Sequence, residues 1–562
     1  MNKHAIYHIP DAPYAYGKDM DTLTVRLKVA KDDVKVCKIY YKDRYDESNP
    51  FESKEMSIIA ETELFSYFQE DISLFRNRYR YFFELEDNDG NHYVYDERGI
   101  RVGTKDSFGI NPFQFAYIAK GDLYEDSKWL QESVAYQIFV DRFCNGDESI
   151  NPDNTMKWGN VNLTYHSRFG GDLRGIINQL DYLKELGIDL IYLTPIFESN
   201  TAHKYNVTDY YSIDPEFGNI DTIKELVSKA HEKGIRIVLD AVFNHSGADF
   251  FAFKDVLENQ EKSKYVDWYF IDKFPVSTEN KSYYTFGNDQ RNMPKLNTSN
   301  EEVREYLLKV SEYWIKEVGI DGWRLDVCDE VDHDFWRAFK KRVKKANKDA
   351  VIIGEIMHEA NSFLKGDQLD SIMNYPFKLA MVDFFAKNNI SAEEFDSVLG
   401  LNRIMYMDSI TKQMWNLIGS HDTPRFFTEC SEDIDRMKLA IAFQFTYIGV
   451  PYIYYGDEVG LTGSNDPYSR KCMVWEEELQ NKEILEFYKE MIKLRKDNKA
   501  LIYGDYKVLF CKDNVLVFER NYGDEKITIA FNNNGYDYYL QMYQDNEFKV
   551  VGNLKAREFK IL

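Results

Sequence analysis

The chain has 562 residues, a hydrophobic fraction of 44% and a formal net charge of −24. This length predicts several domains, and the composition is that of a globular protein able to bury a sizeable core. No basic block accompanies the negative charge, so nucleic acid and anionic membranes are excluded as expected partners, and solubility suffices to explain the acidity. Aromatic residues reach 15%, which fits core packing and also fits stacking on sugar rings.

The six cysteines are scattered along the chain, with no CxxC pair and no spacing typical of a metal site. The beginning of the chain contains no apolar signal-peptide core, and no later apolar run is long enough to span a bilayer. We therefore expect a cytoplasmic protein with free thiols and no membrane partner.

Up to about residue 120, apolar residues recur at every second position. In segments 23–29 and 34–40 they alternate with polar residues, which predicts half-buried strands. Segments 79–85 and 93–95 flank Asp87–Asn91, whose Asp, Asn and Gly residues are typical of a hairpin turn. This part of the chain is predicted to be a separate β-sandwich domain.

From about residue 130, strands alternate with amphipathic helices. An amphipathic helix, for instance that around Leu173–Leu183, is followed three times by a Gly-Ile pair and an apolar strand; the pairs are Gly187-Ile188, Gly234-Ile235 and Gly319-Ile320. The expected strands are 134–140, 189–194, 235–240, 321–326, 351–355, 371–373, 414–418 and 451–455. Eight parallel-type strands without a GxGxxG or Walker sequence favour an α/β fold of the (β/α)8 TIM-barrel type over an open doubly wound sheet.

Two further regions interrupt or follow the barrel. The aromatic-rich stretch after the third strand is too long for a βα loop, which predicts a small inserted domain. After about residue 500 the period of two returns, which predicts a final all-β domain. The expected domains are residues 1–122 (N-terminal β-sandwich), 123–245 (first part of the barrel), 246–298 (inserted domain), 299–500 (second part of the barrel) and 501–562 (C-terminal β-domain).

Acidic residues end several of the predicted barrel strands, where the chemistry of such a barrel takes place. Asp240 ends the third strand, Asp326 the fourth and Glu355 the fifth, while Asp422 follows the seventh. Arg324 lies two residues before Asp326 on the same face of its strand, where it would keep that carboxylate ionised and oriented. Strand or helix capping explains any single acid here but not readily four acids and an arginine together.

An acidic cluster can bind a divalent metal, but Arg324 in its middle would repel a cation. A nucleophilic carboxylate paired with a proton-donating one is the arrangement of glycosidases. Aromatic residues and neutral histidines around such a pair suit a substrate rich in hydroxyl groups. We therefore favour a glycoside hydrolase over a metal site.

Four motifs carry a family resemblance. Asp240-Ala-Val-Phe-Asn-His245, Gly322-Trp-Arg-Leu-Asp326, Gly354-Glu-Ile-Met-His358 and Ser420-His-Asp-Thr-Pro-Arg425 resemble, in order and spacing, the signature regions of the α-amylase family, glycoside hydrolase family 13. Met293-Pro-Lys-Leu-Asn297 resembles the fifth region of its neopullulanase, cyclomaltodextrinase and maltogenic amylase subgroup. The resemblance covers nearly the whole chain and implies a retaining hydrolase of α-1,4-glucosidic bonds in cyclomaltodextrins, pullulan, maltooligosaccharides and starch, with some transglycosylation.

The resemblance also implies roles for individual residues. Asp326 would attack the anomeric carbon, Glu355 would protonate the leaving oxygen and later activate water, and Asp422 would hold the sugar hydroxyls. Asp240 would be the structural acid that orients Arg324. The implied substrate-binding residues are His203, Tyr205, His245, Arg324, Glu330, His421 and Trp475.

Three positions depart from the pattern, and one loop resembles a calcium site. Cys328, Asp329 and Met357 stand where relatives often have Ala, Asn and Trp, on the acceptor side of the site. The implied Ca²⁺ ligands are oxygen-bearing positions near the first strand: Asn145, Asp147, Asn151, Gly170 and Asp172. A plain Asn-Gly turn is the alternative interpretation of this loop.

The subgroup resemblance further implies a homodimer in which the N-terminal domain covers the partner's active site and narrows it to short or cyclic glucans. Two other functions stay open. One is a mainly transglycosylating glucanotransferase, which product analysis at high sugar concentration would separate. The other is a non-catalytic glucan-binding relative, although such proteins usually lose acids that are all present here: Asp326, Glu355 and Asp422.

Overall fold

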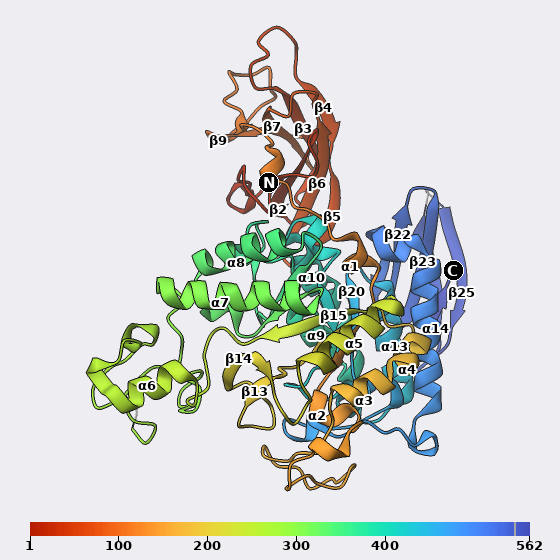
Figure 1. The fold of residues 1–562 in the computed structure, drawn as a ribbon. Coiled ribbons are helices and arrows are strands. Elements are labelled where there is room, and N and C mark those ends of the chain that lie inside the picture. The colour runs from red at the N-terminus through yellow and green to blue at the C-terminus, as the bar shows by residue number, and fades with distance from the viewer. Residues whose placement is uncertain (281, 545–546) are drawn as a thin grey trace.

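The structure is a computed structural model that describes residues 1–280, 282–544 and 547–562. A central barrel carries an all-β domain at each end of the chain, and a small excursion that contains α6 projects from it (Figure 1). The central strands pair in parallel, as expected for the α/β barrel class, and all-β regions flank them in the chain. The described chain contains no helix that is long and apolar enough to cross a membrane.

Two antiparallel sheets form the N-terminal domain. The first has the order β1-β2-β6-β5, and the second has the order β4-β3-β7-β8-β9 with β10 added against β7. The strands are β1 (Ala15–Gly17), β2 (Thr22–Ala30), β3 (Val34–Asp43), β4 (Glu52–Glu55), β5 (Ser57–Glu61), β6 (Phe65–Ser73), β7 (Tyr79–Asp87), β8 (His92–Asp96), β9 (Gly99–Val102) and β10 (Phe113–Phe115). Alternate residues of β2, from Leu23 to Val29, fill the core between the sheets, as the period of two predicts.

The other face of β2 differs from the expectation of a half-buried strand, because it packs on the barrel. Arg26 is only 1% exposed. Its guanidinium donates hydrogen bonds to the carbonyls of Ile404 at 3.0 Å and Tyr406 at 2.6 Å, and pairs with Asp408 at 2.6 Å. One buried arginine therefore fixes the N-terminal domain to the barrel.

Eight parallel strands make the barrel, in the order β18-β17-β16-β15-β12-β11-β20-β19. A single parallel bridge between Met373 and Trp415 joins the two ends of this order and closes the sheet. The strands are β11 (Ala135–Ile138), β12 (Leu190–Leu193), β15 (Arg236–Ala241), β16 (Gly322–Leu325), β17 (Val351–Gly354), β18 (Ser371–Ile372), β19 (Trp415–Leu417) and β20 (Val450–Tyr454). All eight predicted barrel strands are confirmed, each within a few residues of its predicted bounds.

Helices surround the barrel. Their bounds are α1 (Lys128–Glu132), α2 (Val140–Phe143), α3 (Leu173–Asn178), α4 (Leu180–Leu186), α5 (Ile220–Glu232), α7 (Glu301–Tyr313), α8 (His333–Ala346), α9 (Tyr375–Met381), α10 (Ala392–Ile404), α11 (Asp408–Thr411), α12 (Phe426–Glu429), α13 (Ile434–Thr446), α14 (Lys482–Asp497) and α15 (Lys499–Tyr503). Gly187 and Gly319 end helical segments with φ of 98° and 85°, the left-handed conformation that the Gly-Ile pairs predict. The helix expected around Leu173–Leu183 is instead two helices that meet at Gln179.

The excursion between β15 and α7 contains α6 (Phe251–Asn259) and a set of isolated antiparallel bridges. Its aromatic residues supply its own packing, since Trp268, Tyr269 and Tyr283 are buried. A bridge between His245 and Lys295 returns the chain to the barrel mouth. A short hairpin, β13 (Phe197–Ser199) with β14 (Val207–Ile213), lies between β12 and α5.

The chain ends in antiparallel strands, as the returning period of two predicts. Four of them pair in the order β21-β22-β23-β26, and β24 pairs with β25. Their bounds are β21 (Asp505–Lys512), β22 (Val515–Tyr522), β23 (Glu525–Asn532), β24 (Tyr538–Gln544), β25 (Glu547–Leu554) and β26 (Glu558–Ile561). The buried Arg520 donates to the carbonyls of Thr446 and Gly504, which fixes β22 to the end of α13.

Candidate active site

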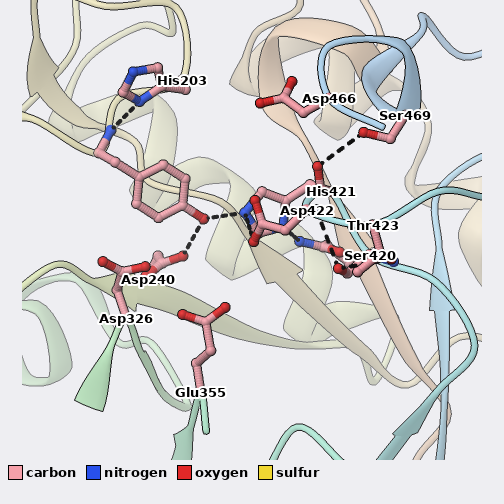
Figure 2. Close-up of polar contacts among 12 residues, drawn as sticks. His203, Asp240, Asp326, Glu355, Ser420, His421, Asp422, Thr423, Asp466 and Ser469 are labelled. Atoms are coloured by element: carbon pink, nitrogen blue, oxygen red, sulfur yellow. Dashed lines mark hydrogen bonds and ion pairs between the residues drawn. The ribbon is translucent and has the colours of Figure 1, made fainter. Parts of the chain in front are cut away.

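A cavity of about 850 Å³ opens at the carboxyl ends of the barrel strands. Its walls come from the residues after β16, β17 and β19, from the hairpin region around Tyr205, and from Phe286 and Met293 of the excursion. Asp326, Glu355 and Asp422 all line it, and Figure 2 shows their carboxyl groups gathered around one space. The three predicted catalytic acids, which follow the ends of barrel strands, therefore line one cleft.

Asp326 follows β16 and is oriented by an ion-pair chain beneath the cleft. Nη1 of Arg324 lies 3.0 Å from Oδ1 of Asp326 and 3.0 Å from Oδ2 of Asp240. Tyr192 also donates its hydroxyl to Asp240, at 2.6 Å. Arg324 is fully buried, so its side chain cannot change direction without losing two carboxylate partners.

Glu355 follows β17 and shares the same guanidinium. Nη2 of Arg324 lies 2.5 Å from Oε1 of Glu355, without the alignment of a hydrogen bond. The backbone N–H of Val327 donates to Oε2 at 3.2 Å. Val327 has φ 44° and ψ 45°, a left-handed conformation that costs a β-branched residue about 1–2 kcal/mol or more. In this strained conformation the N–H of Val327 points towards Glu355.

The two carboxyl groups differ in their hydrogen bonding to Arg324. Burial raises the pKa of both, and the Arg324 guanidinium opposes this rise. For Glu355, burial together with the charge of Asp422 leaves the pKa at about 7. The aligned hydrogen bond of Arg324 goes to Asp326 and favours its ionised form, while a pKa of about 7 leaves Glu355 partly protonated at neutral pH. The site thus presents one nucleophile and one acid to the same small volume.

Tyr205, His421 and Asp422 form a connected wall opposite the Asp326–Glu355 pair. The hydroxyl of Tyr205 donates to Asp240 at 3.1 Å and lies 2.6 Å from Nε2 of His421. Gln137 donates its amide to Nδ1 of His421 at 2.7 Å, so Nε2 carries the ring proton. Nε2 also lies 3.1 Å from Asp422. Burial lowers the pKa of His421 to about 3, which keeps this ring neutral.

Arg470, which sequence reasoning missed, holds Asp422 in place. Its Nη2 donates to Asp422 at 2.9 Å, its Nε donates to the carbonyl of His421 at 2.9 Å, and its Nη1 pairs with Asp466 at 3.2 Å. Although burial favours the protonated acid, His421 and Arg470 bring the pKa of Asp422 below its usual value. Asp466 and Arg470 both line the cleft. The i, i+4 spacing of Asp466 and Arg470 in the loop after β20 was the sequence signal that could have indicated this ion pair.

The other predicted histidines line the same cleft. Nδ1 of His203 accepts the backbone N–H of Tyr205 at 3.1 Å, and burial lowers the pKa of His203 to about 4. Nε2 of His245 lies 3.0 Å from the backbone carbonyl of Tyr205, and its ring stacks on Phe286. Burial also lowers the pKa of His245 to about 3. Both rings are neutral, and their binding of sugar hydroxyls stays a prediction.

Two more predicted substrate-binding residues have different surroundings. Glu330 lines the cleft but is already paired with Lys295 of the excursion at 3.1 Å. Trp475 is not among the residues that line it, and its role in substrate binding stays a prediction. Its indole N–H donates to the carbonyl of Phe143 at 2.7 Å, and its ring packs edge-to-face on Tyr182 in a separate pocket of about 380 Å³.

The predicted calcium-loop residues come together beside that separate pocket. Oδ1 of Asn145 is buried and has no hydrogen-bond partner among the residues that the structure describes, while its Nδ2 donates to Asn151 at 3.2 Å. A Cβ on Gly170 would lie 2.3 Å from Oδ1 of Asn151, so only glycine leaves this space open. Asp172 accepts three backbone N–H groups, and Asp147 accepts from Ser149. An unpartnered amide oxygen in an oxygen-rich loop fits a hard cation.

Comparisons with known proteins agree with this geometry. Residues 137–504 match the family model described as the α-amylase catalytic domain, and residues 1–119 match the α-amylase N-terminal Ig-like domain. A cyclomaltodextrinase from Thermoanaerobacter pseudethanolicus is 48% identical over 95% of this chain and 93% of its own. Neopullulanase 2 from Thermoactinomyces vulgaris is 44% identical over 95% and 92%. A solved cyclomaltodextrinase structure superposes with a TM-score of 0.93 at 41% identity, covering 96% of this chain and 93% of that one.

Proposed function

This chain belongs to the α-amylase family and is a glycoside hydrolase of the cyclomaltodextrinase, neopullulanase and maltogenic amylase type, and we propose that it cleaves α-1,4-glucosidic bonds with retention of configuration. One observation carries the mechanism. The guanidinium of Arg324 contacts both Asp326 and Glu355, so a nucleophile and an acid face one small volume. Such closely placed carboxyls are the arrangement of retaining glycosidases, in which they lie about 5–5.5 Å apart.

The first half of the reaction forms a covalent intermediate. The ionised Asp326 attacks the anomeric carbon and forms a glycosyl ester, while Glu355 gives its proton to the leaving oxygen and becomes a carboxylate. Asp422, held by Arg470, accepts hydrogen bonds from hydroxyl groups of the same sugar and favours a distorted ring. Tyr205 presents its ring to the sugar from the cleft wall.

The second half regenerates the enzyme. Glu355, now a carboxylate, removes a proton from water, which attacks the anomeric carbon and breaks the ester to Asp326. The product has the configuration of the substrate because the carbon has been inverted twice. A sugar hydroxyl in place of water gives transglycosylation by the same chemistry.

We infer the substrates from the cleft and from the relatives. A cavity of about 850 Å³ with Phe286, Met293 and Met357 on its walls suits short or cyclic α-glucans. The two curated relatives are named for action on cyclomaltodextrins and pullulan. The proposed substrates are therefore cyclomaltodextrins, pullulan and maltooligosaccharides, including starch fragments.

Product analysis tests this proposal. Purified enzyme is incubated separately with β-cyclodextrin, pullulan and soluble starch, and the products are followed by chromatography and by NMR of the anomeric protons. Short α-glucans that appear first as α-anomers are the expected result. Products that appear first as β-anomers would rule out retention, and no products from any of the three glucans would rule out the function.

A mainly transglycosylating enzyme is the second candidate. Met357 is 51% exposed at the cleft, where an apolar side chain favours a sugar over water as the acceptor. Products longer than the substrate, dominant at high maltotriose concentration, would favour this candidate. A non-catalytic glucan binder is disfavoured because all three acids occupy the cleft.

The pKa of Glu355 predicts the alkaline side of the pH profile. Glu355 must be protonated for the first half-reaction, and its pKa is raised from the ordinary 4.5 to about 7. The acid is therefore available below about pH 7, and kcat/KM for maltotriose is expected to fall about tenfold per pH unit above it. An initial-rate profile between about pH 4 and 9 measures this. A fall that begins near pH 4.5 would contradict the assignment of Glu355.

We propose that Asn145, Asp147, Asn151, Gly170 and Asp172 hold a structural Ca²⁺. The unpartnered Oδ1 of Asn145 and the open space at Gly170 support this choice. A bound cation would supply charge neutralisation for an oxygen-rich loop and would tie the segment after β11 to the start of α3. It would have no part in bond cleavage, because Asp326 and Glu355 supply that chemistry.

Removal of this cation is expected to lower stability more than catalysis. Treatment with a chelator should lower Tm by several degrees, about 2–4 °C per kcal/mol lost in a domain of this size, and added Ca²⁺ should restore it. Asn145→Ala should abolish the response to Ca²⁺. The matched control is Asn162→Ala, an exposed asparagine in a nearby loop. An enzyme without calcium after gentle purification, with a Tm that calcium does not change, would contradict the site.

We propose a homodimer formed through the N-terminal domain. Phe75 is 94% exposed and Leu64 is 65% exposed on that domain, where burial against a second chain would remove apolar surface from water. Sedimentation equilibrium should give twice the chain mass, and Phe75→Asp should shift the equilibrium towards monomer. A monomer at working concentration would contradict the proposal.

We also propose a cytoplasmic location. All six cysteines are free, and four of them are buried: Cys37, Cys328, Cys430 and Cys472. Unpaired thiols are typical of a reducing compartment. Fractionation of the source cells, followed by activity measurement, tests the location.

A further inference from the structure

Two neighbouring loops of the cleft are joined by an ion pair that the proposed reaction does not use. Asp329 lies in the 3₁₀ turn Cys328–Glu330, directly after the nucleophile. His358 lies three residues after the acid Glu355. Nε2 of His358 is 2.8 Å from Oδ2 of Asp329, so this pair connects the segment after β16 to the segment after β17.

The same turn has further attachments. The thiol of Cys328 donates to the backbone carbonyl of Glu355 at 3.4 Å. Glu330 pairs with Lys295 of the excursion at 3.1 Å. The Asp329–His358 pair is more exposed than the Glu330–Lys295 pair, since the side chains of His358 and Asp329 are 64% and 27% exposed and those of Glu330 and Lys295 are 47% and 19% exposed. It is therefore the attachment that can change without disturbing the buried base of the site.

The position of this pair relative to Glu355 identifies the part of the substrate that it faces. Glu355 protonates the leaving oxygen, so the leaving sugar, and later the incoming acceptor, lie beyond Glu355. Asp329 itself and Met357, the residue before His358 in the chain, line the cleft. In the proposed reaction Tyr205 and Asp422, which also line the cleft, hold the donor sugar.

We propose that Asp329 and His358 form a clamp that positions the acceptor side of the cleft and thereby sets how often a sugar, rather than water, completes the reaction. The inference rests on the proposed double-displacement function and concerns its second half. Both residues are positioning residues. They fix Met357 and the turn after Asp326 relative to each other, and so fix the surface on which an acceptor sugar would lie.

The hydrogen-bond pattern shows which form of His358 the clamp needs. Nδ1 lies 2.9 Å from the carbonyl of Glu359, and Nε2 faces the carboxylate of Asp329. A neutral imidazole has one N–H and can satisfy only one of these acceptors, whereas the imidazolium satisfies both. The hydrogen bond to Asp329, then that to Glu359, raises the pKa of His358 above 6.5. The clamp is thus complete at low pH and weakens as pH rises through that raised pKa.

The facing groups are acidic on both sides. Asp329 comes from the turn after β16, and Glu359 comes from the loop of His358 itself. Both favour the charged ring of His358. The ratio of transfer to hydrolysis should therefore fall as pH rises, independently of Glu355, because the two outcomes share the first half-reaction.

The test compares His358→Gln, Asp329→Asn and the double variant with the wild-type enzyme. Each is given maltotriose as donor and methyl α-glucoside as acceptor, and transfer and hydrolysis products are counted in the same reaction. Each single substitution should lower the ratio of transfer to hydrolysis about two- to fivefold, the size expected for a partly exposed ion pair. The double variant should be no lower than either single variant, because the two residues act as one unit.

A matched control separates this effect from a general loss of surface charge. Asp334 is 76% exposed and pairs with Arg337 on α8, outside the cleft, so Asp334→Asn should keep the wild-type ratio. The ratio should lose its pH dependence in His358→Gln. An unchanged ratio in both single variants, or additive losses in the double variant, would overturn the clamp. A wild-type enzyme that converts no α-glucan would instead overturn the proposed function.

Discussion

Asp326→Asn is expected to lower kcat for maltotriose by about 10⁴-fold or more, with a small change in KM. The amide keeps the size of the side chain and can still face Arg324, but it cannot form the glycosyl ester. Loss of a covalent nucleophile removes the intermediate itself, which is why the effect reaches the largest class seen for catalytic residues. Initial rates with an assay sensitive to residual wild-type enzyme measure it.

Rescue by azide and a control variant test the role of Asp326 further. Azide, a small external nucleophile, should attack the anomeric carbon in Asp326→Asn and give a β-glycosyl azide, since only one inversion then takes place. Asp334→Asn, the same chemical change at an exposed position on α8, should keep wild-type turnover. Turnover of Asp326→Asn within tenfold of the wild type would show that another group is the nucleophile.

Glu355→Gln is expected to lower kcat for maltotriose by about 10²–10⁴-fold, the contribution of a positioned general acid and base. The amide can accept the N–H of Val327, so the loop geometry is expected to persist. The loss should depend on the leaving group. A maltosyl fluoride, whose leaving group needs no proton, should still react with Asp326 and accumulate the intermediate, whereas maltotriose should hardly react.

The pH profile supplies the second signature of Glu355. In the wild type the alkaline fall follows a group whose pKa is raised to about 7. In Glu355→Gln this fall should disappear for the fluoride substrate, because no proton donor remains to titrate. A variant with an unchanged alkaline fall, or with equal losses for both substrates, would assign the acid to another residue.

The barrel could be predicted because its signals are local. A buried strand after each Gly-Ile pair and an acid at the strand end both follow from short stretches of sequence, and parallel strands bring those ends to one rim. The helix around Leu173–Leu183 was predicted as one because Leu173, Ile176, Ile177, Leu180 and Leu183 suit a single helical face. The break at Gln179 leaves those residues buried, so the periodicity does not reveal it.

The parts of the site that sequence reasoning missed depend on distant loops. Arg470 reaches Asp422 from the loop after β20, and no periodic pattern marks a loop residue that pairs with an acid 48 positions earlier. Trp475 lies only five residues further, yet its N–H is bound to Phe143 and its ring faces a different pocket. The direction of such side chains is set by tertiary packing, which is why neighbours in sequence have unrelated surroundings.

The contacts of Arg324 could be predicted from the sequence only in part. Its proximity to Asp326 follows from strand alternation, since residues i and i+2 share a face. Its contacts with Asp240 and Glu355 come from the neighbouring strands β15 and β17, and only the order of strands in the closed barrel places them together. The central claim, an ionised aspartate and a protonated glutamate facing one linkage, depends on that order.

The most direct test of this claim is to trap the intermediate. Glu355→Gln is incubated with 5-fluoro-maltosyl fluoride, the protein is digested, and the masses of the peptides are measured by mass spectrometry. The expected result is one maltosyl-derived mass added to the peptide that contains Asp326, and none in the double variant that also carries Asp326→Asn. An adduct on another peptide, or complete turnover to an inverted product without any adduct, would contradict the mechanism.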